Sequence, residues 1–181
     1  MIPALVVRGR AMALVFKKLL EPEFGRELRV LDVDHMGEAA SLARSILSNR
    51  KAIVAVVGEA TQEELRMMHR HLVFLLINVE CADLWKISMI VPQTETLLFL
   101  DRGLVRLALG REPTEEEMVR GRTESRRVLE EQLGLERRKL DEELCRRLET
   151  ADVSPLADHP AVQQVREFFR AHREGRASLS L

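Results

Sequence analysis

Residues 52 to 61 read Ala-Ile-Val-Ala-Val-Val-Gly-Glu-Ala-Thr, and the rest of the chain is organised around this stretch. Six consecutive apolar residues lead into a small, acidic and turn-prone end at Gly58 and Glu59. A short strand that is apolar on both faces is typical of the centre of a parallel sheet with helices packed on each side. Because ligands of open α/β sheets bind outside the carboxyl ends of the strands, we expect a functional site near Gly58 and Glu59.

Three other short segments have the pattern of strands, and apolar residues at helical spacing lie between them. This alternation predicts an α/β fold with a four-stranded, mainly parallel sheet, helices on both faces and right-handed crossovers. Thr61, with Glu64 three residues later, is expected to cap the helix that follows the central strand. The other predicted strands are residues 5–7, 28–33 and 85–91, and the helices before the central strand are residues 10–20 and 39–47.

After residue 95 the pattern predicts helices only, over residues 96–109, from Pro113 to Gly134, over 135–148 and around 162–169. We therefore expect an α/β domain at residues 1–100 and a helical extension packed on it at residues 101–176. Residues 177–181 are expected to be a disordered tail. The leucines between residues 126 and 148 also suggest a helical surface through which a homo-oligomer or another protein partner would assemble.

The composition is that of a soluble globular protein: of 181 residues, 46% are hydrophobic and 31% are charged, and the formal net charge is -1. The balance of charges argues against a broad electrostatic surface for nucleic acid, although a local arginine patch remains one alternative. No stretch is apolar for long enough to span a membrane, so we expect a cytoplasmic protein without a membrane partner. Two cysteines far apart in sequence, Cys81 and Cys145, are expected to be reduced and structural.

The order of these pieces resembles the topoisomerase-primase fold, called Toprim, and most closely the small versions in the OLD-family nucleases. Residues 6–9, Val-Val-Arg-Gly, occupy the place of its first motif, residues 57–61 that of its second, and residues 92–99 that of its third. In that family, acidic residues of these motifs hold one or two magnesium ions and the enzymes cut or transfer phosphodiesters. The resemblance therefore implies magnesium as a cofactor and a nucleic acid as a partner.

This chain departs from the family pattern at three of the four expected acids. Arg8 stands where the first acid is expected, and Gly58 and Ala60 stand where two aspartates are expected; Glu95 is retained. At about 4 Å and an effective dielectric constant near 20, Arg8 would repel each unit charge of a metal ion by roughly 4 kcal/mol. We therefore expect no tight magnesium site and no cofactor, and we predict a non-catalytic binding or assembly module that is associated with nucleic acid or with another protein.

Two alternatives stay open for the acids near the strand ends. One is an active metal-dependent nuclease or phosphodiester-transfer enzyme in which Glu38, Glu59 and Glu95 hold magnesium, with Glu59 and Glu95 as catalytic residues. The other is that Glu59 and Glu95 only favour the helices that follow them. For Arg8, we prefer an ion pair with Glu59 or Glu95 over the binding of a phosphate, because a buried charge needs a partner.

The end of the second strand is the most polar strand end in the chain. Asp34 and His35 are candidate metal ligands there, but alternate residues of a strand face opposite sides, so a solvated loop is the expected structure. Four arginines between residues 120 and 127 are expected to form a salt-bridged, solvated helix face, with phosphate contact as the alternative. The full set of predicted ligand-binding or site-lining residues is Arg8, Gly9, Asp34, His35 and Gly58.

Overall fold

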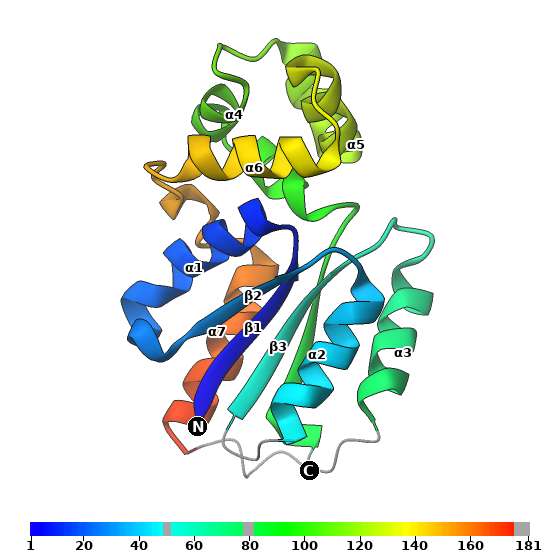
Figure 1. Ribbon diagram of the computed structural model, residues 1–181, viewed down its shortest axis with the longest axis vertical. Coiled ribbons are helices and arrows are strands. Elements are labelled where there is room, and N and C mark those ends of the chain that lie inside the picture. Colours follow the sequence, from blue (N-terminus) through cyan, green and yellow to red (C-terminus); the bar gives the residue numbers. More distant parts are fainter. Residues whose placement is uncertain (49–51, 78–81, 176–181) are drawn as a thin grey trace.

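The structure is a computed structural model, and it describes residues 1–48, 52–77 and 82–175. Figure 1 shows a sheet flanked by helices, with a separate group of helices stacked over one end of the sheet. The predicted tail at residues 177–181 and Cys81 lie outside the described residues. No helix within the described ranges is both long and apolar enough to cross a membrane.

All four strands of the sheet are parallel, in the order β2-β1-β3-β4, which confirms the predicted α/β fold. The central strand is buried along its whole length, as its apolar sequence predicted. The sheet ends at β4, which is therefore an edge strand. The strands are β1 (Ile2–Arg8), β2 (Arg29–Val33), β3 (Ala52–Glu59) and β4 (Trp85–Ile90).

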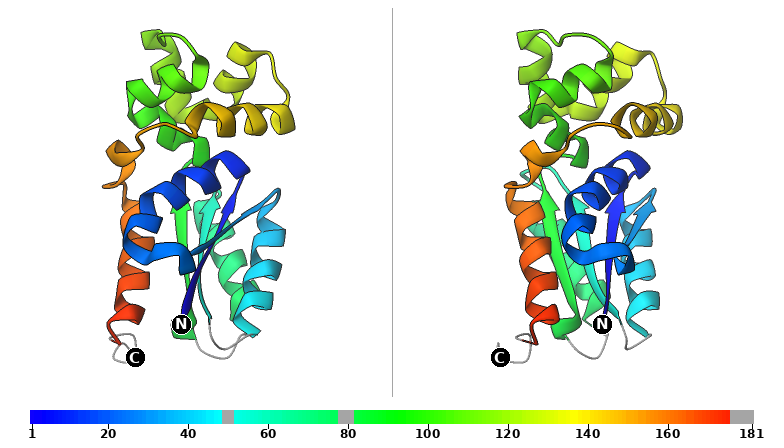
Figure 2. Two further views of the ribbon diagram at one scale, coloured as in Figure 1. Left: turned by 60° about the vertical axis from the view of Figure 1, so that its left-hand side comes forward. Right: turned by 90° about the vertical axis from the view of Figure 1, so that its left-hand side faces the viewer.

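Each face of the sheet is covered by two helices. On one face lie α1 (Arg10–Phe24) and α7 (Pro160–Arg173), and on the other lie α2 (Met36–Ser48) and α3 (Leu65–Leu76). Figure 2 shows α7 running along the sheet although it comes last in the sequence. A hydrophobic core lies on each face of the sheet, and alternate residues of β3 belong to one or the other. Ile53, Ala55 and Val57 pack with α1 and α7, and Val54 and Val56 pack with α2 and α3.

A helical lobe, which we define as residues 102–148, stands over the carboxyl ends of the strands. It contains α4 (Arg102–Leu109), α5 (Glu115–Leu133) and α6 (Arg137–Leu148), and the chain enters it through the 3-10 helix η3 (Thr94–Leu100). The range expected as one extension, residues 101–176, is thus divided between this lobe and α7 on the sheet. Three short 3-10 turns complete the fold: η1 (Gly25–Glu27), η2 (Ala82–Leu84) and η4 (Ser154–Leu156).

Local capping explains where the helices differ from the predicted ranges. The helix expected over residues 96–109 is split because Asp101 caps α4, its Oδ1 accepting a hydrogen bond of 2.9 Å from the Leu104 N–H. Helix α1 continues past Pro22 and ends where Gly25 adopts a positive φ of 71°. Helix α3 begins at Leu65, after the turn in which Thr61 and Glu64 bond each other.

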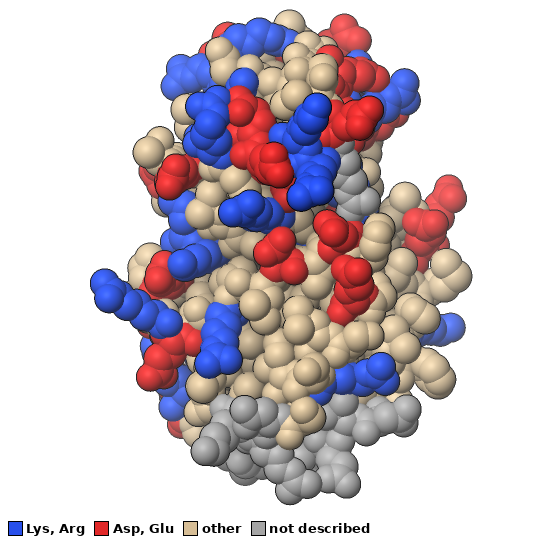
Figure 3. Space-filling model, viewed as in Figure 1, with Lys and Arg blue, Asp and Glu red and all other residues tan. Residues whose placement is uncertain are grey.

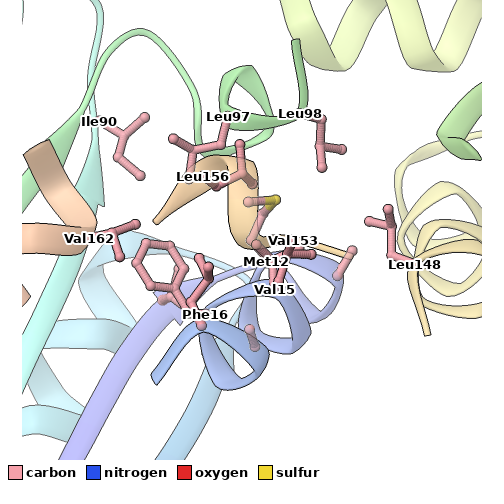
Figure 4. Close-up of a cluster of buried hydrophobic side chains, with 14 of the residues drawn as sticks. Met12, Val15, Phe16, Ile90, Leu97, Leu98, Leu148, Val153, Leu156 and Val162 are labelled. Carbon is pink, nitrogen blue, oxygen red and sulfur yellow. The ribbon is translucent and has the colours of Figure 1, made fainter. Parts of the chain in front are cut away.

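The core on the α1 side extends into the helical lobe, as Figure 4 shows for Met12 and Val15 of α1 with Leu148 of α6. Four of the leucines that suggested an oligomer surface belong to this core of the single chain and are at most 2% exposed, whereas Leu133 and Leu135 are only partly buried against it. The four buried leucines are thus covered within one copy, and assembly of the chain through these helices stays a prediction. These leucines are Leu129, Leu140, Leu144 and Leu148.

Candidate functional site

A cleft of about 570 Å³ separates the carboxyl ends of β1 and β2 from α6. Its volume is within the range of small-molecule sites, and its position is where open α/β sheets bind ligands. Four arginines, one histidine and five carboxylate side chains line it, so the cleft is highly polar and carries both signs of charge in nearly equal number. Four of the five predicted lining residues, Arg8, Gly9, Asp34 and His35, line this cleft.

Arg8 and Glu59 form an ion pair across the ends of β1 and β3. The two strands are neighbours in the sheet, and the helices that follow them, α1 and α3, pack on opposite faces, so this is the topological switch point of the fold. Arg8 also donates from Nε to the Asp34 carbonyl at 3.1 Å, which joins the ends of three strands. The Arg8 and Glu59 side chains are only 19% and 6% exposed. The ion pair between Arg8 and Glu59 that the sequence suggested is therefore present and largely buried.

Glu59 has partners on its second carboxylate oxygen as well. Its Oε2 accepts hydrogen bonds from the Thr94 N–H at 3.0 Å and from the Thr94 hydroxyl at 3.2 Å. Arg126 Nη2 lies 3.5 Å from the same oxygen. Both oxygens of the only acid at the end of the central strand are thus engaged by groups of the protein.

Glu95 is held by Arg126 in a bidentate ion pair. Arg126 Nε and Nη2 lie 3.0 and 2.8 Å from Glu95 Oε1, and Nη2 is 2.9 Å from Oε2. The Thr94 hydroxyl also lies 3.4 Å from Glu95 Oε2. Arg8, Glu59, Arg126 and Glu95 therefore alternate in charge, and we call these four residues the ion-pair chain.

A break in α5 positions Arg126. Glu124 has non-helical φ and ψ of -129° and 41°, and just beyond it the Ser125 hydroxyl and the Arg126 N–H each donate to Gln93 Oε1 at 3.1 Å. Gly121 allows α5 to approach this closely, since a Cβ there would lie 1.9 Å from a ring carbon of Phe99. The break and the close approach together aim the Arg126 side chain at the strand ends.

The sequence interpretation missed this role of Arg126. It placed the residue in a salt-bridged, solvated face, and its neighbours Arg120 and Arg127 do occupy such a face, each pairing with Glu131 at 2.9 and 2.8 Å. Figure 3 shows basic and acidic side chains intermingled over the helical lobe. The charge pattern does not distinguish Arg126 from Arg127. Consecutive residues of a helix point about 100° apart, and the break at Glu124 with the contacts to Gln93 turns Arg126 toward the strand ends.

Gly58 faces away from the cleft. A Cβ on Gly58 would lie 2.6 Å from Met89 Sδ and 3.1 Å from Leu72 Cδ1, in the core between the sheet and α3. A side chain at this position would therefore enter an apolar core and would not reach the ion-pair chain. The aspartate that the Toprim pattern places here would be buried among apolar groups.

Asp141 of α6 is a second residue that the sequence did not reveal. Its carboxylate accepts hydrogen bonds from the Arg10 and Ala11 N–H groups, at 2.7 and 2.9 Å, and so caps the start of α1. Burial raises the pKa of Asp141 despite these bonds, and the charges of Glu95 and Asp32 raise it further. The partners are about 130 positions apart in the chain, so no local pattern links them.

The residues at the strand ends do not fit a magnesium ion. Glu38 lies in the first turn of α2, where it accepts a 3.2 Å hydrogen bond from the Asp34 N–H, and it does not join Glu59 and Glu95. Across residues 1–48, 52–77 and 82–175, no three His, Cys, Asp or Glu side chains are grouped so that they would hold a metal ion. The two acids that do converge, Glu59 and Glu95, already bind guanidinium groups.

Comparison of the chain with protein-family models, with curated proteins and with solved structures found no match. The resemblance to Toprim domains therefore stays a prediction that rests on the order of the elements and on the residues at the strand ends. The geometry of the ion-pair chain is independent of that resemblance.

Proposed function

We propose that this chain is a Toprim-like module in which guanidinium groups have replaced divalent metal, and that it acts as a non-catalytic binding or assembly module. The observation that carries this proposal is the ion-pair chain. Arg8 and Arg126 provide the positive charge at the place where, in the resembling family, carboxylates hold magnesium. Under this proposal, the protein needs no metal ion to neutralise Glu59 and Glu95.

The energetics support this interpretation. An isolated buried carboxylate is strongly disfavoured, and removing one partner of a buried ion pair costs about 3–5 kcal/mol. Magnesium requires carboxylate oxygens at near-octahedral positions. To bind here, the ion would have to displace Arg126 from Glu95 or Arg8 from Glu59, and the displaced guanidinium would still repel it. The ion-pair chain therefore disfavours metal binding twice, through lost contacts and through repulsion.

The cleft is the part of the molecule that we propose binds a partner. It lies beside the ion-pair chain, and both Arg8 and Arg126 reach its wall. A lining of mixed charge favours a hydrophilic partner that offers both donors and acceptors. A nucleic acid is the partner that the Toprim resemblance suggests, and a protein segment is the alternative.

A cleavage assay tests the non-catalytic part of the proposal. Wild-type protein is incubated with single- and double-stranded DNA and with RNA, in the presence of Mg²⁺ or Mn²⁺, beside Glu59→Ala and the exposed control Glu64→Ala. We expect no metal-dependent cleavage by any of the three proteins. Cleavage that Glu59→Ala loses and Glu64→Ala retains would contradict the proposal.

The same assay decides the alternative of an active phosphodiester enzyme. That alternative is favoured by one observation: Glu59 and Glu95 share the hydroxyl of Thr94, so two carboxylates do converge at the strand ends.

The binding part of the proposal is tested separately, by fluorescence anisotropy of labelled DNA and RNA at low salt. Binding that weakens in Arg10→Glu and Arg138→Glu, which change the charge of the cleft wall, would support a nucleic-acid partner. Absence of binding would exclude nucleic acid and leave a protein partner.

A further inference from the structure

Helices α1 and α6 are joined by charged groups at both ends of their contact. At the start of α1, the Asp141 carboxylate from α6 accepts the N–H groups of Arg10 and Ala11, at 2.7 and 2.9 Å. At the end of α6, Lys18 from α1 donates from Nζ to the carbonyls of Leu148 and Glu149, at 3.2 and 2.9 Å, and to that of Ala151. Each helix thus supplies the side chain that caps the other.

The two contacts have the signs that helix ends require. The first N–H groups of a helix and its last carbonyls have no partner within the helix, and the helix dipole favours an anion at the start and a cation at the end. Asp141 satisfies two such N–H groups of α1, and Lys18 satisfies carbonyls at and just beyond the end of α6. Apolar side chains fill the space between the two contacts; Leu140, Leu144 and Leu148 are at most 2% exposed.

We propose that Asp141 and Lys18 form a two-ended clamp that fixes the helical lobe to α1, so that α6 is a rigid wall of the cleft and not a lid that closes over it. This inference does not depend on the proposed function, since it concerns how the cleft is held open for any ligand. A single contact would leave α6 able to pivot about that point. The contacts at Asp141, one turn into α6, and at the end of α6 oppose such a pivot, with the Arg126–Glu95 pair of α5 as a third attachment of the lobe.

The clamp also bears directly on the shape of the cleft, because Asp141 itself lines it. Its neighbours Arg138 and Glu142 line the same wall and are exposed, forming only a weak contact of 3.8 Å with each other. The position of this wall is therefore set by Asp141 and Lys18 together with the buried leucines between them, and not by the exposed charges around them.

The distance between two nitroxide spin labels, measured by double electron–electron resonance, tests the clamp. The labels are attached at Ser41→Cys in α2 and Lys139→Cys in α6, both exposed, in a chain that also carries Cys81→Ser and Cys145→Ala. We expect a single narrow distance distribution for the otherwise wild-type chain. In the variant that also carries Lys18→Ala and Asp141→Ala, the distribution should broaden and extend to longer distances.

Matched controls separate the clamp from a general loss of charge. Lys17→Ala and Glu142→Ala remove the same charges one position away, at side chains that do not cap the partner helix, and should leave the distribution narrow. If the double alanine variant does not fold by circular dichroism, the single variants Lys18→Ala and Asp141→Ala release one end each and should each broaden the distribution to a smaller degree. A broad or two-peaked distribution for the wild-type chain would overturn the clamp, and so would a folded double variant that stays as narrow as the wild type.

Discussion

Arg126 and Arg127 are neighbours in α5, but their side chains belong to two different regions of the molecule. Arg126 is 14% exposed and joins the ion-pair chain at the mouth of the sheet, where it holds Glu95 and approaches Glu59. Arg127 is 67% exposed and belongs to the outer ion pairs of the helical lobe, with Glu131 as its partner. The comparison shows that the position on the helix, the break at Glu124 and the resulting burial, and not the residue type, decide what an arginine does here.

The two regions should differ in their contribution to stability. Exposed ion pairs contribute about 0–1 kcal/mol, because water screens them and two long side chains must be ordered. Removing the guanidinium partner of a buried carboxylate lowers the free energy of unfolding by far more, because the buried charge is left without its ion-pair partner.

The largest effect is expected from removing the inner arginine. Arg126→Ala leaves Glu95 buried without its bidentate partner and should lower the free energy of unfolding by about 3–5 kcal/mol. Arg127→Ala, one residue away, should change it by about 0–1 kcal/mol. Urea denaturation followed by circular dichroism measures both, and equal effects for the two variants would remove the distinction between the regions.

A smaller loss of unfolding free energy is expected from changing Gly121, because this residue affects Arg126 through the packing of α5 and not through charge. In Gly121→Ala the new methyl group would meet the ring of Phe99, and relief of this overlap should cost about 1–3 kcal/mol and move α5 away from the strand ends. Gly37→Ala in α2 is the matched control, because no atom lies within 4 Å of its would-be Cβ and its φ is not positive. Denaturation of both variants tests this, and an unchanged Gly121→Ala would show that α5 does not need its close approach to Phe99.

The smallest effect concerns an acid of the helical lobe away from the cleft. Hydrogen bonds from Arg111, opposed in part by burial and aided by the capping box with Thr114, lower the pKa of Glu117 to about 2. A lowered pKa in the folded state contributes stability that is complete above the ordinary pKa, near 4.5, and that is lost as the pH falls toward about 2. The difference in unfolding free energy between wild type and Glu117→Gln should therefore shrink as the pH falls through this window. Glu116→Gln, at the exposed neighbouring position, serves as the control, and a difference that does not change with pH would contradict the prediction.

The sequence was sufficient for the features that depend on local pattern. The apolar run at residues 52–59 predicted a fully buried central strand, and the partnership of Arg8 with an acid followed from the cost of burying a charge. Arg126 was not predictable in this way, because its direction depends on contacts of Ser125 and Gln93 that form only in the folded chain. Asp141 was hidden for a related reason: a cap that comes from 130 residues away leaves no local signature.

Titration with Mn²⁺, followed by electron paramagnetic resonance of the free ion, tests the replacement of metal by guanidinium most directly. The wild-type chain is compared with the double variant Glu59→Gln, Glu95→Gln, in which both acids of the ion-pair chain are neutral. The account predicts that the free-ion signal of Mn²⁺ is the same with wild-type protein, with the double variant and in buffer alone. A micromolar site in the wild-type chain that disappears in the double variant would contradict it.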